Sequence, residues 1–337
     1  MDWFEKLTGF RENNYYDTRA KLKVEGRQLQ SLVNGKSYGI GALELLSLET
    51  LRQRVKTTGG LPGRLKVSLE TGDVRHMHRL PENVGALFQV ASQFNLLEMS
   101  GPEVTPEDGV TIYQHDHTQG PACAIAAGAA TIYRNYYAPV GGGEGQTKDR
   151  QFDGLADLGN VLSAALNKPV GDLWTMRNGY ALCDGDALDD IASHVRTLRP
   201  DQIDILRGTL RVGVHSDVEV TDAEGEHRSL VSQAFCSALP IAYTRVPSAH
   251  WKPFASLVLE AAYEATMLSA ILNKQRGASN VVLLTLLGGG AFGNEAEWIH
   301  TAIRRALTMT SGFGLDVRLV SYGTPSREIL QMAKDFG

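Results

Sequence analysis

Four glycines separate an apolar run from an amphipathic segment, and this arrangement constrains the fold more than any other feature. The sequence reads TLLGGGAFGNEAEWI over 285–299, and the apolar run VVLLTLL occupies 281–287. Uninterrupted β-branched and leucine residues are typical of a parallel strand that is buried on both faces. Glycine allows the tight turn that leads from such a strand into a helix. The sequence therefore predicts a strand, a glycine loop and a helix over 295–309.

The same alternation of helix and strand continues through the last third of the chain. A long helix is expected over 252–277, a further strand over 316–322, and a last helix from Ser326. Strands that alternate with helices indicate an α/β fold with a parallel sheet. Upstream, the patterns predict helices over 42–55, 121–137 and 153–167, and extended segments over 64–80, 86–94, 110–114, 173–183, 208–221 and 229–243.

Composition and charge exclude several classes of protein. The chain has 337 residues, a formal net charge of -5 and three cysteines without a CxxC pair. A net negative charge does not indicate the basic surface that binds nucleic acid. No apolar run approaches the ~18 residues of a membrane span. The first residues lack the apolar core of a signal peptide, and three distant cysteines suit neither a disulfide framework nor a zinc site. We expect a cytoplasmic protein that binds neither nucleic acid nor membrane.

The glycine loop at 288–294 is the strongest candidate for ligand binding. Backbone N–H groups of such a loop, next to a helix start, can bind a phosphate or pyrophosphate. A tight turn without a ligand is the alternative. The spacing also satisfies the G-x-G-x-x-G pattern of dinucleotide-binding folds. However, only one predicted strand follows it, and that strand ends in Ser321 and Tyr322 where such folds carry an acidic residue. A dinucleotide-binding fold is therefore disfavoured. The candidate ligand-binding residues here are Gly288, Gly289, Gly290, Ala291, Phe292, Gly293 and Asn294.

A second candidate segment runs over 106–130, where a short extended piece leads through Gln119-Gly120-Pro121 into an alanine-rich helix. Proline favours the first turn of a helix, and small residues such as Ala122 allow a ligand to approach. Asp108 and Asp116 precede this turn, and each could be a catalytic carboxylate or an ordinary loop residue. His115 and His117 flank Asp116, but no third ligand lies nearby, so we predict no metal site and no cofactor.

A third candidate segment follows the strand predicted over 86–94. Gln93, Asn95 and Glu98 leave this strand and could hydrogen-bond the hydroxyl groups of a sugar, although turn-forming residues would look the same. The chain contains no GxSxG, HExxH or Cys–His signature, so nucleophilic and zinc hydrolases lack support.

Together the three segments resemble the macrodomain superfamily, in particular its poly(ADP-ribose) glycohydrolase-like branch. The matching stretches are QVASQFN with Asn95, DHTQGPACAIA (116–126) and LLGGGAFGN (286–294), the last similar to the GxGAFG loop of the glycohydrolases. The Gln-Glu-Glu signature of those enzymes is absent. Asp108 and Asp116 stand instead where some divergent bacterial ADP-ribosyl hydrolases carry their acidic residues.

The resemblance implies a three-layer α/β/α sandwich with a mixed, largely parallel sheet. The expected core comprises 63–140 and 226–337, with a mostly helical extension over 1–62 and an insertion over 141–225 that begins at the glycine-rich linker 141–149. Gln119, Gly120, Ala122 and the 288–294 loop would bind the diphosphate of ADP-ribose, and Phe292 would pack on the distal ribose.

The implied activity is hydrolysis that removes ADP-ribose from a modified protein. An oxocarbenium-like sugar needs a nearby carboxylate and a positioned water, and Asp116 would orient that water or the 2″-hydroxyl, supported by Asp108 or Glu98. The expected partners are ADP-ribose or an ADP-ribosylated protein. Two alternatives remain open: a module that binds ADP-ribose without cleaving it, and an unrelated nucleotide-using enzyme.

Overall fold

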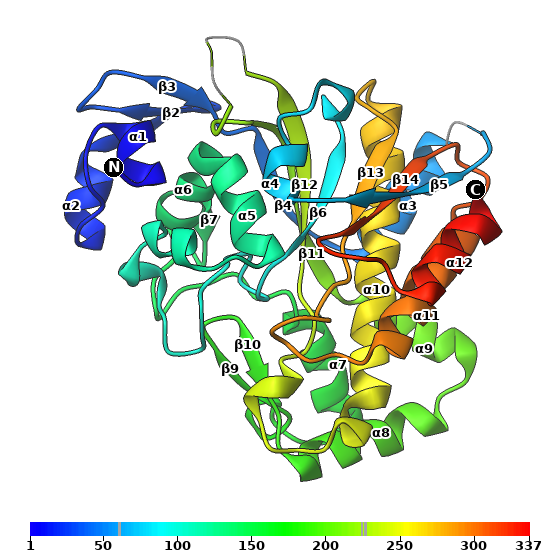
Figure 1. Ribbon diagram of the computed structural model, residues 1–337. Helices are drawn as coiled ribbons and strands as arrows, with labels where there is room; N and C mark the ends of the chain where they lie inside the picture. The colour runs from blue at the N-terminus through cyan, green and yellow to red at the C-terminus, as the bar shows by residue number, and fades with distance from the viewer. Residues whose placement is uncertain (60–61, 224, 226–227) are drawn as a thin grey trace.

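A seven-stranded sheet forms the centre of the protein (Figure 1). The computed structural model describes residues 1–59, 62–223, 225 and 228–337. Five neighbouring strands run parallel, and β11 pairs antiparallel both with β12 and with the edge strand β4. The predicted α/β fold with a mixed, largely parallel sheet is therefore confirmed. The strand order is β4 (Ala42–Ser47), β11 (Arg211–Glu219), β12 (Leu230–Cys236), β6 (Leu87–Ala91), β13 (Val281–Leu284), β14 (Asp316–Ser321) and β5 (Lys66–Thr71).

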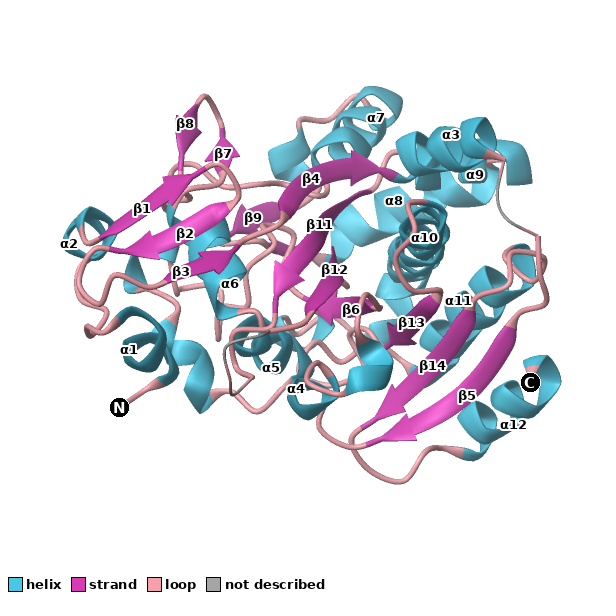
Figure 2. Cartoon of the chain, turned by 90° about the horizontal axis from the view of Figure 1, so that it is seen from above, coloured by secondary structure: helices cyan, strands magenta, loops and turns pink. Residues whose placement is uncertain are grey.

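Helices cover both faces of the sheet, and alternate residues of the central strands supply the two cores. Val282 and Leu284 of β13 belong to one core, whereas Val281 and Leu283 belong to the other. Such alternation places successive side chains on opposite faces. Figure 2 shows the resulting layers. One face carries α3 (Leu48–Thr58), α10 (Ser248–Gln275) and α11 (Ala296–Met309), and the other α4 (Val74–Met77), α5 (Gln119–Ala126) and α6 (Gly128–Tyr136).

The helix α10 is the central support of its layer. Within the described residues it alone is long and apolar enough to span a membrane, although the sequence showed no uninterrupted apolar run of that length. In the fold, 83% of its most apolar window is buried inside the protein. Its apolar residues therefore serve the core.

The smaller elements surround this sandwich. The N-terminal segment folds as α1 (Trp3–Thr8), α2 (Tyr15–Ala20) and a three-stranded sheet of β1 (Leu22–Glu25), β2 (Gln28–Ser31) and β3 (Ser37–Gly39). The mid-chain segment adds two hairpins, β7 (Pro139–Val140) with β8 (Gly143–Glu144) and β9 (Thr175–Arg177) with β10 (Tyr180–Leu182), and the helices α7 (Ala156–Leu166), α8 (Gly185–Thr197) and α9 (Pro200–Gly208). The chain ends in α12 (Arg327–Phe336).

The expected outlines of the extension and the insertion need correction. The segment 1–62, expected to be mostly helical, contains three strands of the small sheet and then β4 of the main sheet. The segment 141–225, expected as an insertion, contributes β11, which pairs with both β4 and β12. The linker at 141–149 forms the hairpin β7–β8, whose turn uses positive φ at Gly141 and Gly142. Residues 60–61, 224 and 226–227 of the predicted segments lie outside the described residues.

Several local predictions were also wrong in part. The segment 64–80, expected to be extended, forms β5 and then the helix α4. The helix expected over 42–55 begins only at Leu48, because 42–47 pairs with β11 as β4. The piece 110–114, expected to be extended, is a 3-10 turn (Thr111–His115), and Glu12 accepts the N–H groups of Val110 and Thr111 before it. The single helix expected over 121–137 is interrupted at Ala127 and forms α5 and α6.

The start of α5 packs directly on the end of β6. A side chain on Gly120 would overlap the carbonyl oxygen of Ala91, so only glycine allows this approach. The side chain of Gln119 reinforces the contact, because its Oε1 accepts the Ala91 N–H at 2.8 Å and its Nε2 donates to the Gln89 carbonyl at 2.7 Å. The position of α5 is therefore fixed by the strand end.

We predict that Gly120→Ala lowers the free energy of unfolding by about 1–3 kcal/mol, the usual cost of overpacking. Gly185→Ala at the start of α8 is the matched control, because a Cβ there meets no described atom within 4 Å. Urea denaturation of both variants measures the effect. Equal stability of the two variants would contradict the predicted contact.

Candidate functional site

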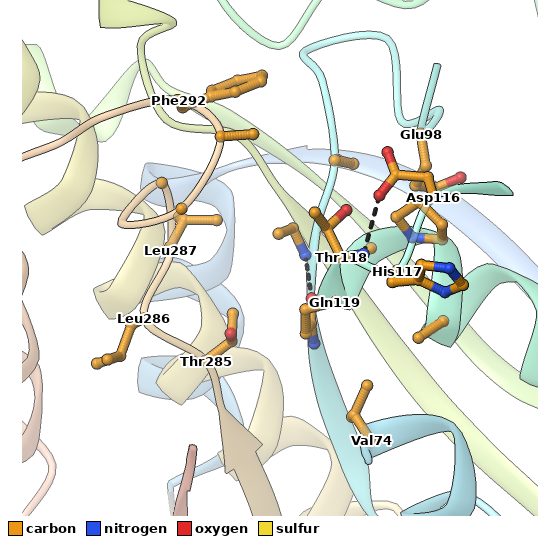
Figure 3. Close-up of a pocket in the computed structure, with 18 of the residues that line it drawn as sticks. Val74, Glu98, Asp116, His117, Thr118, Gln119, Thr285, Leu286, Leu287 and Phe292 are labelled. Carbon is orange, nitrogen blue, oxygen red and sulfur yellow. Dashed lines mark hydrogen bonds between the residues drawn. The ribbon is translucent and has the colours of Figure 1, made fainter. Parts of the chain in front are cut away.

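A pocket opens where the parallel strands reach their carboxyl ends (Figure 3). Its wall includes Ala91 at the end of β6, Thr285 after β13, Ser321 of β14 and Gly72 after β5. In open α/β sheets this edge is where ligands bind. The volume of about 420 Å³ lies within the range of ~300–1,000 Å³ that is usual for small-molecule pockets.

One wall of the pocket is the start of α5. Asp116, Gln119, Gly120 and Ala122 line it. The carboxylate of Asp116 accepts the N–H of Thr118 at 2.8 Å, which shapes the turn into the helix. The amide of Gln119 is occupied by β6, so this side chain fixes the helix. The small residues Gly120 and Ala122 leave this wall open to a ligand.

The opposite wall is the glycine loop, whose shape is fixed by contacts with neighbouring segments of the chain. Gly288 and Gly293 adopt φ of +75° and +72°, and a Cβ on Gly288 would overlap the side chain of Ala238. Asn294 donates through Nδ2 to the Leu239 carbonyl at 2.9 Å. From α10, the hydroxyl of Tyr263 donates to the Thr285 carbonyl at 2.7 Å and accepts the Leu287 N–H at 2.8 Å.

The outer part of this loop is open to a ligand. Gly290, Ala291 and Phe292 line the pocket, and their N–H groups make no hydrogen bond within the described part of the chain. A Cβ on Gly290 would meet open space. These donors lie on the wall opposite α5, and a helix start and a glycine loop are both elements that can bind an anion.

A buried ion pair includes one of the residues that line the pocket, Glu98. Figure 3 shows Glu98 and Asp116 across the pocket from Leu287 and Phe292. The Glu98 carboxylate lies 3.4 Å from Nη2 of Arg134, and neither side chain is exposed. Burial raises the pKa of Glu98 to about 7, and Arg134 partly opposes this increase. Asp116 is the more accessible of the two carboxylates.

Three aromatic rings close one end of the pocket. The rings of Tyr180, Tyr243 and Phe292 have centroids 5.0–5.7 Å apart. Tyr180 comes from β10, in the segment expected as an insertion, and its hydroxyl donates to the Met99 carbonyl at 2.8 Å. The mid-chain segment therefore helps to build the pocket.

Most of the predicted site residues meet in this pocket, but some do not. Asp108 lies outside it and accepts hydrogen bonds from the N–H and hydroxyl of Thr105, so its carboxylate caps a turn. Asn95 is buried against Leu97 and Gln151. Gly289, Gly293 and Asn294 support the glycine loop without lining the cavity. The predicted residues that do line it are Gln93, Glu98, Asp116, Gln119, Gly120, Ala122, Gly288, Gly290, Ala291 and Phe292.

Sequence patterns missed several residues of the wall. Asp73 caps α4 and lines the pocket, as do Tyr180, Tyr243 and the largely exposed Tyr322. The pairing of β5 with β14 could have indicated Asp73 and Tyr322, since both lie within two residues of a strand end. No sequence pattern around Tyr180 indicates that it belongs to the pocket wall. No group of three metal-binding side chains occurs among the described residues, and the three cysteines are buried and free.

Comparison with known proteins finds similar solved structures but no similar sequence. No family model matches the chain, and no curated protein sequence matches it. Among solved structures, it is similar to poly(ADP-ribose) glycohydrolase from Deinococcus radiodurans, with 10% identity, a TM-score of 0.46, and coverage of 87% of this chain and 93% of that one. The glycohydrolase from Thermomonospora curvata gives 13% identity, a TM-score of 0.42, and coverage of 91% and 92%. Sequence identities and TM-scores this low identify neither a substrate nor site residues for this chain.

The titration of Glu98 predicts a pH-dependent stability difference from Glu98→Gln. Because burial raises the pKa of Glu98 from 4.5 to about 7, the folded state favours the protonated form. This stabilising contribution is complete below pH 4.5 and is lost as the pH rises through 7. Relative to Glu98→Gln, the wild-type protein should therefore lose stability between pH 5 and 8 in urea denaturation. A difference that is constant over this range would contradict the raised pKa.

Proposed function

We propose that the pocket binds ADP-ribose, with the diphosphate between the start of α5 and the outer glycine loop. The observation that carries this proposal is the pair of facing walls, where Gly120 and Gly290–Phe292 bring backbone N–H groups to the carboxyl edge of a parallel sheet. Helix starts and glycine loops are established phosphate-binding elements. The resemblance of the same segments to the macrodomain superfamily supports ADP-ribose as the particular diphosphate.

The two ends of the pocket suit the two ends of ADP-ribose. Tyr322 and Asp73 lie at the end where β14 and β5 finish. Exposed tyrosine can stack on a base, and a carboxylate can accept from an exocyclic amine, so adenine fits there. The end with Phe292, Tyr180 and Asp116 then receives the distal ribose.

Hydrolysis of an ADP-ribosyl linkage is the reaction that this orientation favours. The bond from C1″ to the modified group breaks with oxocarbenium character, and water adds to C1″. Asp116 accepts one water proton, the other remains on the new hydroxyl, and the leaving group takes up a proton from solvent. The carboxylate of Asp116 is the accessible one, so it is assigned this role.

A module that only binds ADP-ribose is the second candidate function. The observation that favours it is the complete burial of the Glu98 side chain, which leaves Asp116 as the accessible carboxylate of the predicted catalytic set. Binding would need the same glycine-rich walls, so the two functions differ only in turnover.

Calorimetric titration with ADP-ribose tests binding, and release of free ADP-ribose from a modified protein tests hydrolysis. Asp116→Asn should reduce turnover about 100-fold, a usual effect of removing a general base, with little change in affinity. Asp108→Asn should leave turnover within about twofold, because Asp108 lies outside the pocket. Absence of binding at millimolar ADP-ribose contradicts both functions, and binding without release favours the second.

The orientation of the ligand has its own test. Tyr322→Ala should weaken ADP-ribose binding by about 1–3 kcal/mol, the usual contribution of base stacking, and should leave ribose 5-phosphate binding unchanged. Tyr16→Ala, an exposed tyrosine outside the pocket, is the control. Equal affinity of Tyr322→Ala and wild type for ADP-ribose would contradict the assignment of adenine to this end.

A further inference from the structure

A second pocket, here called the basic pocket, uses residues of the same helix α4 as the proposed ADP-ribose site. Asp73 and Val74 line the ADP-ribose site, whereas Arg75 and Arg79 line the basic pocket, and the two pockets have no described lining residue in common. The volume of the basic pocket is about 470 Å³, which is also usual for small-molecule pockets. Its charged lining residues are the basic Lys6, Lys36, Arg75, Arg79 and Arg228 and the acidic Asp2 and Asp222.

The two lysines of the basic pocket are brought together by a contact between α1 and β3. The hydroxyl of Tyr38, on β3, donates to the carbonyl of Leu7, on α1, at 2.9 Å. Lys6 precedes Leu7 directly, and Lys36 lies just before β3. Both lysines are exposed, and neither side chain has an ion pair or hydrogen bond within the described part of the chain. Their ammonium groups are therefore available to a ligand.

The arginines of the basic pocket are held in place by carboxylates. Arg75 donates through Nε and Nη2 to the two carboxylate oxygens of Asp222, at 2.7 and 2.6 Å. Nη1 of Arg79 lies 4.0 Å from the same carboxylate. Arg228 donates through Nη1 to Glu219 at 3.2 Å. These contacts position the guanidinium groups before a ligand arrives, which reduces the cost of ordering them on binding.

The described carboxylates do not balance the positive charge of the basic pocket. Asp222 is paired with Arg75, and Glu219 is paired with Arg228. Asp2 is the remaining acidic residue of the described wall, and its Oδ1 accepts the N–H of Glu5 at 2.7 Å as the cap of α1. Three basic side chains, those of Lys6, Lys36 and Arg79, are then opposed by one carboxylate. Like charges that are held around one cavity repel each other, so an anion bound between them lowers the electrostatic energy.

We propose that the basic pocket is a second ligand site, which binds a small anion that carries phosphate groups. Guanidinium groups match the oxygens of phosphate with paired N–H donors, and ammonium groups bind phosphate as point charges. The cations surround one cavity, so a compact anion such as a diphosphate fits them better than an extended polyanion. This site is separate from the proposed function, because its residues do not line the ADP-ribose pocket.

Calorimetric titration with pyrophosphate at low ionic strength tests this proposal. Each lost cation should weaken binding in the basic pocket about tenfold, the usual effect of removing a hydrogen bond to a charged group. The double variant Lys6→Gln/Lys36→Gln should therefore lose about 100-fold in affinity, and wild type should bind one more pyrophosphate per chain than this variant. The same titration with ADP distinguishes a free diphosphate from one attached to a nucleoside, according to which ligand the basic pocket binds more tightly.

The matched control is the double variant Lys56→Gln/Lys334→Gln. It changes the net charge equally, and both lysines are exposed, lie outside the two pockets and, like Lys6, occupy the last turn of a helix. It should bind pyrophosphate as wild type does.

The same number of bound pyrophosphates in wild type and Lys6→Gln/Lys36→Gln would overturn the proposal, as would equal weakening in the control. If Lys6→Gln/Lys36→Gln does not fold, Arg79→Gln decides by its expected tenfold loss. Release of ADP-ribose from a modified protein should stay within about twofold of wild type in all of these variants. Wild-type protein without this release would refute the proposed hydrolysis and leave the pyrophosphate difference in place, so the two proposals fail separately.

Discussion

The contact between the start of α5 and the end of β6 is the constraint on which the pocket depends. Gly120 is the residue that lets the helix reach the strand, and Gln119 joins the two by hydrogen bonds to Gln89 and Ala91. Because β6 lies at the centre of the sheet, this contact brings the first N–H groups of α5 to its carboxyl edge. The same approach encloses Glu98 and excludes water from its carboxylate.

The second wall depends on the neighbouring strand and on α10. Strand β13 delivers the glycine loop to the same edge, and Tyr263 of α10 holds the loop by its two main-chain contacts. The buried helix thus serves both the core and the site. Two independently supported walls give a pocket whose N–H groups are in place before any ligand arrives, which reduces the cost of ordering the site on binding.

The sequence predicted the parts of the site that depend on local pattern. The succession of strand, glycines and helix at 281–309 is encoded by adjacent residues, and the fold confirms it. Asp108, predicted as a candidate carboxylate, does not line the pocket, because it caps a turn beside Thr105 that the residue types alone do not distinguish from an active-site loop. Tyr180 and Arg134 were missed because their contacts with Phe292 and Glu98 join segments that are far apart in the sequence.

A crystal structure of the protein with ADP-ribose tests the central claim most directly. The account predicts the diphosphate between Gly120 and Gly290–Phe292, adenine near Tyr322, and the distal ribose beside Asp116. Electron density for the diphosphate elsewhere on the protein would contradict the account, as would a ligand whose distal ribose lies at the Tyr322 end.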